Sequence, residues 1–434
     1  MTSAPSIPAA WRELLADARI AELAAAARGV PTHLVGGAVR DAGLGRPVSD
    51  LDVVVADDGP TIARRLADRT GSRLVALGGD RFGAIRLVSG TRHIDIWDLR
   101  GGALSTDLWR RDFTVNAVAL QVPEGVVTDP TGGLEDLSRK RLRATRAGVF
   151  AEDPVRVLRL ARLATTLPGF SADSATVDWA RAVTPRLGEM PHERLRVELE
   201  LLFGQPRIAP AAAWCVDLDL PTHFFGGGAA LAAASSTTLR PASRLDEWRA
   251  SRPATDPATP RAATSAANSP QALHWTLFTE LFSSSHEATS ARLRDLARRG
   301  LMTRDSSDAA LALLAPPWQA PRDVPGRRRW LHQAGAGWRD SLALRAALAG
   351  SAAELEAWAS LETTYLSWPE ELRAGVLSPP ALLSGEDVQA LLGIAPGPAV
   401  GAALARVRRA QVEGAVRVRE EAEALLRSTP AADG

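Results

Sequence analysis

The chain has 434 residues, 46% of them hydrophobic, and a formal net charge of +1. This length predicts two to four domains, and the near-neutral charge argues against a protein that is basic over its whole surface. The single cysteine, Cys215, excludes an intrachain disulfide and a cysteine-based zinc site. No apolar run approaches the roughly 18 residues of a membrane span, and the polar N-terminus lacks a signal-peptide core, so we expect a cytoplasmic protein.

The first third of the chain combines helical and strand patterns. Leucine and alanine spacing predicts a helix over 8–28, and a second helix is expected over 61–70, where Gly71 can end it. Short apolar runs separated by glycine-containing turns predict the strands 32–35, 51–56, 73–77, 84–88 and 92–97. We therefore expect residues 1–143 to form an α/β head around one mixed sheet.

The remainder of the chain has mainly helical patterns. Strong helices are predicted over 152–167 and 191–203, and we assign them to a helical neck over 144–225. Residues 226–271 are rich in Ala, Ser, Thr and Pro with little apolar periodicity, which is typical of a low-complexity linker or a long loop. Helical patterning then returns, so a helical body and tail are expected over 272–434.

The strongest local pattern is a glycine turn followed by two aspartates. Gly36 and Gly37 follow a predicted strand, and Asp50 and Asp52 begin the next strand about a dozen residues later. Because alternate residues of a strand share a face, the two carboxylates are expected to project together. Converging carboxylates are stabilised by a cation, and oxygen ligands suit Mg²⁺. Exposed N–H groups at the glycine turn favour a phosphate, and Arg40 adds a positive charge.

Each part of this pattern is weak alone, because an isolated Asp-x-Asp is more often a solvated strand edge. The same spacing at Asp217 and Asp219 lies in a helical region without a glycine turn, and we assign it a structural role. The combination resembles the class II tRNA nucleotidyltransferase and bacterial poly(A) polymerase family, which has a polymerase-β-like head. In that family paired aspartates bind the catalytic metals. The resemblance implies that Asp50 and Asp52 are catalytic and hold two Mg²⁺ ions.

A second motif runs from Arg110 through Arg111 and Asp112 to Asn116. Adjacent guanidinium groups and an amide can bind anions and a ribose hydroxyl, although a charged helix start would look the same. The motif resembles the family signature that contacts the sugar and phosphates of the incoming nucleotide. The resemblance therefore implies nucleotide binding by Gly36, Gly37, Arg40, Arg110, Arg111, Asp112 and Asn116.

A further motif places Asp153 and Arg156 three residues apart on a predicted helix, where they would share a face. It resembles the amino-acid template of the family. A carboxylate and a guanidinium can together bind the Watson–Crick edge of cytosine or adenine. Arg159 and Arg162 lie on or near the same face and are further candidates for nucleotide binding. The alternative is an ordinary helix ion pair, worth about 0.2–0.5 kcal/mol.

Three other segments resemble the family without obvious chemistry. The segment 129–137 is predicted to be a turn that leads into a helix, with Asp129 as a hinge or cap residue, and 192–200 is predicted to support the neck. In the C-terminal segment 383–401, a Gly/Pro turn precedes a basic helix. Its candidate RNA-binding residues are Arg406, Arg408 and Arg409, although a helix corner with a solvated basic face is equally compatible.

The family resemblance implies tRNA and CTP, with ATP as the alternative, as substrates. Its members add CCA, CC, A or poly(A), and CC-adding members have a shortened loop before the Arg-Arg motif. Only residues 96–109 separate Asp95 from Arg110, so we predict CC addition to the tRNA 3′ end, with tRNA bound by the helical body. Asp95 is either a third carboxylate near the metals or a solvated strand end.

Three alternative functions remain open at this stage. The first is a complete CCA-adding enzyme or a poly(A) polymerase. The second is a non-catalytic RNA-binding protein built on a decayed transferase head. The third is a nucleotidyltransferase that acts on a small molecule, which the long helical body disfavours.

Overall fold

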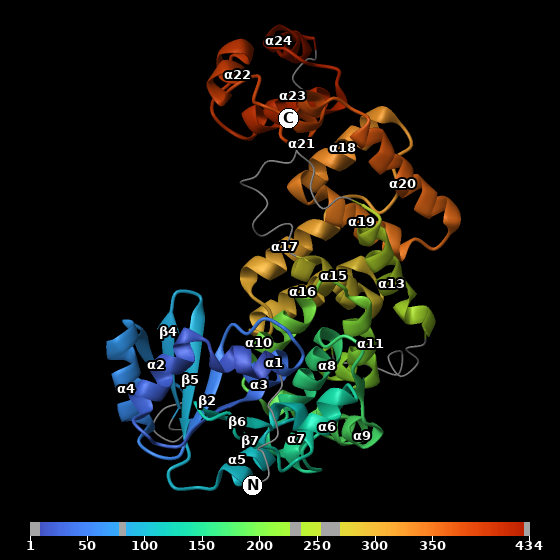
Figure 1. The fold of residues 1–434 in the computed structure, drawn as a ribbon. Helices are drawn as coiled ribbons and strands as arrows, with labels where there is room; N and C mark the ends of the chain where they lie inside the picture. The colour runs from blue at the N-terminus through green and yellow to red at the C-terminus, as the bar shows by residue number, and fades with distance from the viewer. Residues whose placement is uncertain (1–8, 78–83, 226–235, 253–269, 429–434) are drawn as a thin grey trace. The chain divides into compact units, whose positions relative to one another are not determined.

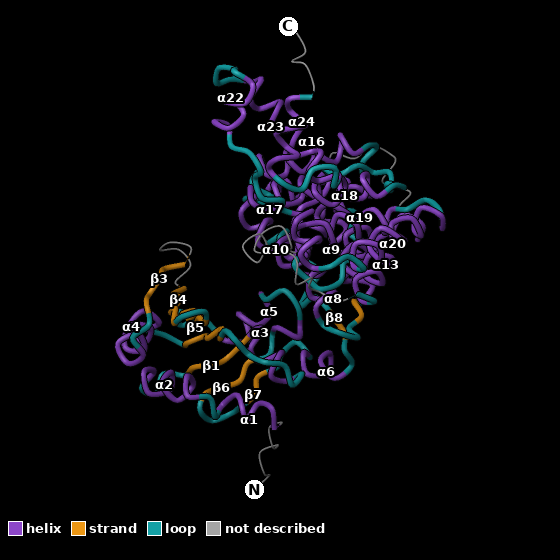
Figure 2. Tube along the Cα trace, turned by 90° about the horizontal axis from the view of Figure 1, so that it is seen from above, coloured by secondary structure: helices purple, strands orange, loops and turns teal. Residues whose placement is uncertain are grey.

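The computed structural model describes residues 9–77, 84–225, 236–252 and 270–428. The chain divides into two compact units, Met1–Glu189 and Met190–Gly434. Every described strand belongs to the first unit, and the described part of the second unit is helical (Figures 1 and 2). This confirms the predicted α/β head followed by a mostly helical remainder. No described helix is both long enough and apolar enough to cross a membrane.

A seven-stranded mixed sheet forms the centre of the first unit. The strands are β1 (Thr32–Val35), β2 (Leu51–Val55), β3 (Arg73–Leu77), β4 (Ala84–Ser89), β5 (Arg92–Asp98), β6 (Ala119–Val122) and β7 (Val127–Thr128). Their order is β3-β4-β5-β2-β1-β6-β7. β2 and β5 run parallel, and the other neighbouring pairs are antiparallel. Five of these strands were predicted from short apolar runs separated by glycine-containing turns.

Four helices cover one face of the sheet. They are α1 (Ala9–Leu15), α2 (Ala18–Ala27), α3 (Gly36–Gly43) and α4 (Gly59–Thr70), and their apolar side chains form the main core with inward-facing residues of the strands. The single helix predicted over 8–28 is wrong. The chain breaks at Asp17, whose carboxylate accepts from the backbone N–H of Arg19 and caps α2.

The opposite face of the sheet is only partly covered. The short helix α5 (Leu104–Arg110) packs Leu108 against Val35 and Val54 in a small second core. Along β2, Leu51, Val53 and Val55 are fully buried in the main core. Because side chains alternate along a strand, Asp52 points to the partly covered face. This face carries the candidate site.

Shorter elements complete the first unit. They are η1 (Thr114–Asn116), α6 (Gly133–Ser138), α7 (Val149–Glu152), α8 (Arg156–Thr166), α9 (Ser174–Val183), η2 (Thr184–Glu189) and the parallel strands β8 (Arg141–Leu142) and β9 (Ser171–Ala172).

The continuous helix predicted over 152–167 is wrong, because Asp153 is extended, with φ −145° and ψ 91°. The following Pro154 disfavours helical backbone at Asp153, so α7 ends there and α8 begins afterwards.

The second unit contains the remaining helices. They are α10 (His192–Phe203), α11 (Ala209–Asp217), α12 (Leu220–Phe225), α13 (Ser236–Ala250), α15 (Pro270–Leu281), α16 (His286–Arg298), α17 (Arg304–Leu314), α18 (Val324–Ala334), η4 (Gly335–Gly337), α19 (Trp338–Leu348), α20 (Ala352–Leu366), α21 (Glu370–Leu377), α22 (Gly385–Leu392), α23 (Pro398–Glu413) and α24 (Arg419–Arg427). Helix α13 corrects part of the linker predicted over 226–271. Its Ala242 and Leu245 are fully buried, so this segment packs into a core. The rest of the predicted linker lies almost entirely outside the described residues.

Candidate active site

A row of charged side chains crosses three strands on the partly covered face. Asp52 on β2 is in register with Asp95 on β5, and Asp95 is in register with Arg86 on β4. Arg86 donates from Nε and Nη2 to the two oxygens of Asp95, each at 2.7 Å. This hydrogen bonding and the charges of Asp95, Asp50 and Asp52 raise the pKa of Arg86. The three carboxylates therefore lie within electrostatic reach of one guanidinium.

Asp50 precedes β2 instead of lying on it, which corrects the predicted strand position. Its Oδ1 accepts from the backbone N–H of His93 at 3.0 Å and also lies 3.0 Å from Nδ1 of the same residue. The other ring nitrogen of His93 lies 3.9 Å from Oδ2 of Asp95. Asp50 and Asp95 therefore contact the same imidazole. The carboxylates are brought together by the β2–β5 pairing and His93, not by strand alternation alone.

The glycine turn lies directly against Asp52. Gly36, the first residue of α3, has a left-handed φ of +68°, which favours glycine. A Cβ atom at Gly36 would lie 2.5 Å from Oδ2 of Asp52, so no side chain fits there. The backbone N–H of Gly37 donates to the Asp52 carboxylate. The turn and the carboxylate therefore form one continuous surface, as the sequence predicted.

The chemistry of these side chains fits a hard divalent cation. Burial raises the pKa of Asp52, the charge of Asp95 acts in the same direction, and Arg111 opposes both. A cation beside Asp50 and Asp52 would offset this unfavourable negative charge. Within the described residues, no group of three or more His, Cys, Asp or Glu side chains is placed to hold a metal ion. Mg²⁺ commonly binds through one or two carboxylates and completes its shell with water and phosphate oxygens.

A chain of polar contacts connects the glycine turn to the second motif. Arg40 donates from Nη1 to Oδ1 of Asn116 at 2.7 Å, and Asn116 donates from Nδ2 to Oδ1 of Asp112 at 3.0 Å. Arg159 of α8 donates from Nε to Oδ2 of Asp112 at 2.7 Å. Two nucleotide-binding candidates from different elements, Asn116 and Arg159, thus contact one carboxylate, and Arg40 is connected to it through Asn116.

The position of Asp112 corrects the expectation that it contacts nucleotide directly. Asp112 is 5% exposed. Burial alone would raise its pKa, but Arg159, Asn116 and the N–H of Phe113 outweigh burial and hold the pKa below its usual range. The side chain is placed to orient Arg159 and Asn116.

Arg156, one of the two base-recognition candidates, is held by backbone carbonyl oxygens. Arg156 donates to the carbonyl oxygen of Arg110 at 2.8 Å and to that of Val149 at 3.1 Å. Its Nε lies 3.9 Å from Oδ2 of Asp153, so the two remain neighbours although they do not share a helix. Arg110 is exposed, and Arg162 is partly exposed on α8. These candidates lie in the same unit as the carboxylate row.

Arg111 is fixed at both its backbone and its side chain. Its guanidinium pairs with Asp107 of α5, with an Nε–Oδ2 distance of 3.0 Å. Its carbonyl oxygen accepts from the hydroxyl of Thr145 at 2.6 Å. Its charge also opposes the rise in the pKa of Asp52 caused by burial, so the Arg-Arg motif interacts electrostatically with the carboxylate row.

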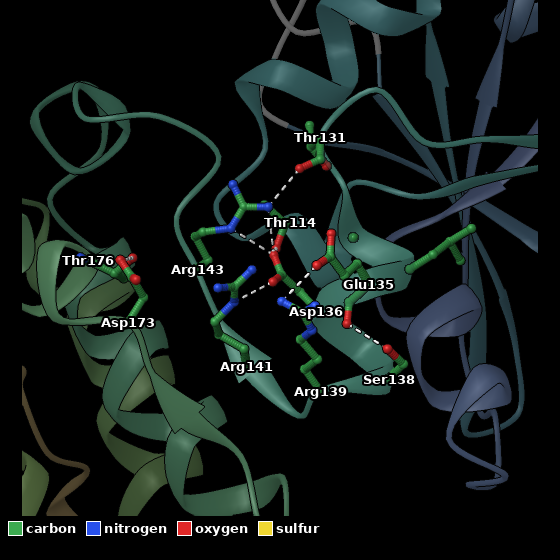
Figure 3. A network of polar contacts seen from close by, with 12 residues as sticks. Thr114, Thr131, Glu135, Asp136, Ser138, Arg139, Arg141, Arg143, Asp173 and Thr176 are labelled. Atoms are coloured by element: carbon green, nitrogen blue, oxygen red, sulfur yellow. Dashed lines mark hydrogen bonds and ion pairs between the residues drawn. The ribbon is translucent and has the colours of Figure 1, made fainter.

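A buried carboxylate that the sequence interpretation missed supports this motif (Figure 3). Asp136 of α6 is fully buried. It accepts from Oγ1 of Thr114 at 2.6 Å, from Nε of Arg141 at 2.5 Å and from Nε of Arg143 at 2.9 Å. Thr114 begins η1, which also contains Asn116, so Asp136 anchors the nucleotide-binding motif to the segment after it.

Asp129 caps the helix that carries Asp136. This is one of the two roles predicted for it, a hinge or a cap residue. Asp129 accepts from the N–H groups of Gly133 and Leu134 at 2.8 and 2.9 Å. These are donors of the first turn of α6, which would otherwise lack partners. Asp129 is therefore a capping residue of α6.

The predicted RNA-binding arginines of the tail make hydrogen bonds and ion pairs within the protein. Arg406 donates to two carbonyl oxygens near the end of α24, at 3.2 and 3.4 Å. Arg408 donates to the carbonyl oxygen of Pro379. These hydrogen bonds tie both side chains to neighbouring backbone, and RNA binding by them stays a prediction. Arg409 pairs with Glu413 at 3.0 Å, and its side chain is 70% exposed.

Comparison with known proteins agrees with this geometry. Residues 32–103 and 101–143 match the model of the poly(A) polymerase head domain. The chain is 30% identical to a CC-adding tRNA nucleotidyltransferase of Geobacter sulfurreducens, with 92% of each chain covered. It is 33% identical to an A-adding tRNA nucleotidyltransferase of Deinococcus radiodurans, covering 91% of this chain and 94% of that one. This chain belongs to the tRNA nucleotidyltransferase family.

The family resemblance implied by the motifs is therefore confirmed. The chain is a nucleotidyltransferase that extends tRNA 3′ ends without a nucleic-acid template, and enzymes of this family generally use divalent metals. The solved CCA-adding enzyme of Bacillus stearothermophilus in complex with CTP has the same fold. Its TM-score is 0.69 at 24% identity, covering 97% of this chain and 98% of that chain.

The close contact between Gly36 and Asp52 gives a first testable prediction. Gly36→Ala should reduce kcat/KM by about 10²-fold, the typical cost of a 1 Å displacement in an active site. The methyl group would displace the Asp52 carboxylate. Gly45→Ala is the matched control, because Gly45 also has a left-handed φ, of +66°, but no atom within 4 Å of an added Cβ.

Both glycine variants should lose similar stability, of about 1–2 kcal/mol, from the left-handed backbone. Only Gly36→Ala should also lose catalytic activity. Steady-state nucleotide incorporation and thermal unfolding, measured on both variants, separate the two effects. Equal activity of the two variants would show that the turn does not position Asp52.

Proposed function

We propose that this nucleotidyltransferase adds two cytidylates to the tRNA 3′ end from CTP. The main support is the connection between β5 and α5, which consists of residues 99–103 only. The N–H of Leu99 donates to the carbonyl oxygen of Val55 at 2.9 Å, and the N–H of Gly101 donates to that of Ala56 at 3.4 Å. The turn is therefore tied to the end of β2.

The start of α4 holds the same turn from its other side. The N–H of Gly59 donates to Oδ2 of Asp98 at 2.9 Å, and the N–H of Arg100 donates to Oδ1 at 2.8 Å. In the family, a flexible loop at this place helps the pocket to change from CTP to ATP. A short turn fixed by four hydrogen bonds is unsuited to that rearrangement, which favours a pocket that remains selective for CTP.

The roles of the site residues follow from their positions. We propose that Asp50 and Asp52 hold two Mg²⁺ ions, with tRNA and CTP as substrates. When bound, such ions supply activation of the attacking 3′ hydroxyl and stabilisation of the leaving pyrophosphate. We propose that Gly36 and Gly37, with Arg40 and Arg111, bind the triphosphate. The protein thus contributes mainly positioning and charge stabilisation, as in other phosphoryl transfers.

Base selection and RNA binding involve other residues. Asp153 and Arg156 are proposed to bind the Watson–Crick edge of cytosine through a carboxylate acceptor and a guanidinium donor. Arg110, Arg159 and Arg162 are the proposed further contacts of the nucleotide. The helical body and tail over 272–434 are proposed to bind tRNA by its shape and phosphates, with Arg409 as the exposed tail contact.

A second candidate product is a single terminal adenylate, because the chain is 33% identical to the A-adding relative over nearly its whole length. The decisive experiment extends three tRNA transcripts that end before CCA, after CC and after CCA. Each is incubated with CTP, ATP or both. Two additions to the first transcript with CTP, and no ATP addition to the second, are expected. Addition of A to the second transcript would contradict CC-only synthesis, and long A tails would indicate a poly(A) polymerase.

A further inference from the structure

The orientation of Asp50 is not set by strand pairing. The β2–β5 ladder begins with Leu51 opposite Ile94, one residue after Asp50. The Asp50 side chain is 38% exposed, so packing restrains it only in part. A side chain at this position would sample several rotamers unless specific hydrogen bonds held it.

His93 provides one backbone hydrogen bond and one close side-chain contact from the neighbouring strand. Oδ1 of Asp50 lies 3.0 Å both from the backbone nitrogen of His93 and from its Nδ1. Oδ2 is contacted by the hydroxyl of Ser49 at 3.1 Å. Because β2 and β5 run parallel, residues 50 and 93 face each other immediately before the ladder begins.

The imidazole also approaches a second carboxylate, on the side away from Asp50. Its Nε2 lies 3.9 Å from Oδ2 of Asp95. That carboxylate is 6% exposed and fixed by both of its oxygens to Arg86. The Asp95–Arg86 pair, in which only the carboxylate is buried, therefore lies on one side of the ring, and Asp50 lies on the other.

We propose that His93 is a positioning residue that holds Asp50 in the orientation required to bind a divalent metal ion. This inference rests on the proposed metal-binding role of Asp50 and Asp52. Hydrogen bonds to ligating groups fix their geometry, and losing one typically costs about 10–100-fold in metal affinity or activity. His93 acts through Asp50 and needs no contact with the nucleotide.

Two substitutions separate the polar contact of the ring from its bulk. His93→Leu removes the contact between Nδ1 and Asp50 but retains volume, and His93→Asn places an amide donor close to the position of Nδ1. The His93 side chain is 30% exposed, so both should fold, which thermal unfolding checks. His93→Ala serves as a second truncation if the leucine variant does not fold. His33→Leu is the control, because His33 lies on β1 and its buried Nδ1 has no hydrogen-bond partner among the described residues.

Mn²⁺ binding, measured by electron paramagnetic resonance without tRNA or nucleotide, reports the metal site directly. His93→Leu should bind Mn²⁺ about 10–100-fold more weakly, and its kcat should require correspondingly more Mg²⁺. The KM for CTP should change little. His93→Asn should recover most of the affinity, and His33→Leu should match the unaltered enzyme.

Wild-type Mn²⁺ affinity in His93→Leu would overturn the inference, as would an asparagine variant no better than leucine. Asp52→Ala distinguishes failure of this inference from failure of the proposed function. If Asp52→Ala retains Mn²⁺ binding and incorporation, the metal-site assignment itself fails. If Asp52→Ala loses both while His93→Leu keeps both, only the role of His93 is refuted.

Discussion

Replacing Asp52 with alanine is expected to lower nucleotide incorporation by at least about 10³-fold, because the metal ions that it is proposed to bind contribute several kcal/mol to the transition state. Asp52 is the carboxylate in contact with the glycine turn, and its Oδ2 would lie 2.5 Å from a Cβ atom at Gly36. The measurement is single-turnover incorporation of CTP into tRNA at saturating enzyme. Binding of tRNA, measured separately, should be nearly unchanged, since no RNA-binding residue is altered.

Stability provides a check that Asp52 variants remain folded. Burial raises the pKa of Asp52, so the folded chain binds this proton more tightly than the unfolded chain does. Stability due to this group therefore falls as pH rises past the ordinary carboxyl pKa. Asp52→Asn should consequently unfold at an equal or higher temperature than the wild type at pH 8 without added metal.

The matched control lies at the end of the same strand. Asp57 lies two residues after the end of β2 but is exposed, and its carboxylate accepts only from the adjacent N–H of Asp58 among the contacts described. Asp57→Asn should leave incorporation unchanged. Comparable losses in the Asp57 and Asp52 variants would indicate a general charge effect instead of a specific metal site.

The largest effect on stability is expected for Asp136→Ala. Breaking a buried ion pair by removing one partner costs about 3–5 kcal/mol. The side chains of Arg141 and Arg143 are 33% and 31% exposed and can partly rehydrate, so we expect a value near the lower limit, about 3 kcal/mol. The hydroxyl of Thr114, which is fully buried, would lose its acceptor. Urea unfolding measures the change.

Glu135→Ala is the control for the Asp136 variant. Glu135 is the preceding residue of α6, but its side chain is 56% exposed and pairs with Arg139, which is 63% exposed. Exposed pairs of this kind contribute about 0–1 kcal/mol. If the two variants lose similar stability, the buried network does not stabilise the first unit as described.

The regular parts of the fold were predictable because they depend on local periodicity. Alternation along this strand predicted that Leu51 and Val53 face the core, away from Asp52, and both are fully buried. The glycine turn and Asp52 also lie together as predicted, because they belong to the ends of adjacent antiparallel strands. Short-range patterns were sufficient for these features.

Other features depend on information that local patterns contain only weakly or not at all. The break at Asp153 could have been predicted, because a residue before proline disfavours helical backbone. Helix α13 was hidden by its Ser, Thr and Pro content, although Ala242 and Leu245 have helical spacing. The contact of Asp50 with His93 joins residues 43 positions apart, and only the tertiary fold determines such pairings.

The most direct test of the central claim is the position of bound metal. Crystals of the chain grown with CTP and Mn²⁺ can be measured at the manganese absorption edge, where anomalous diffraction locates the ions. Two manganese peaks are predicted between the carboxylates of Asp50 and Asp52 and the triphosphate, beside Gly36 and Gly37. Manganese bound elsewhere, with no contact to Asp52 while CTP occupies the pocket, would contradict the proposed active site.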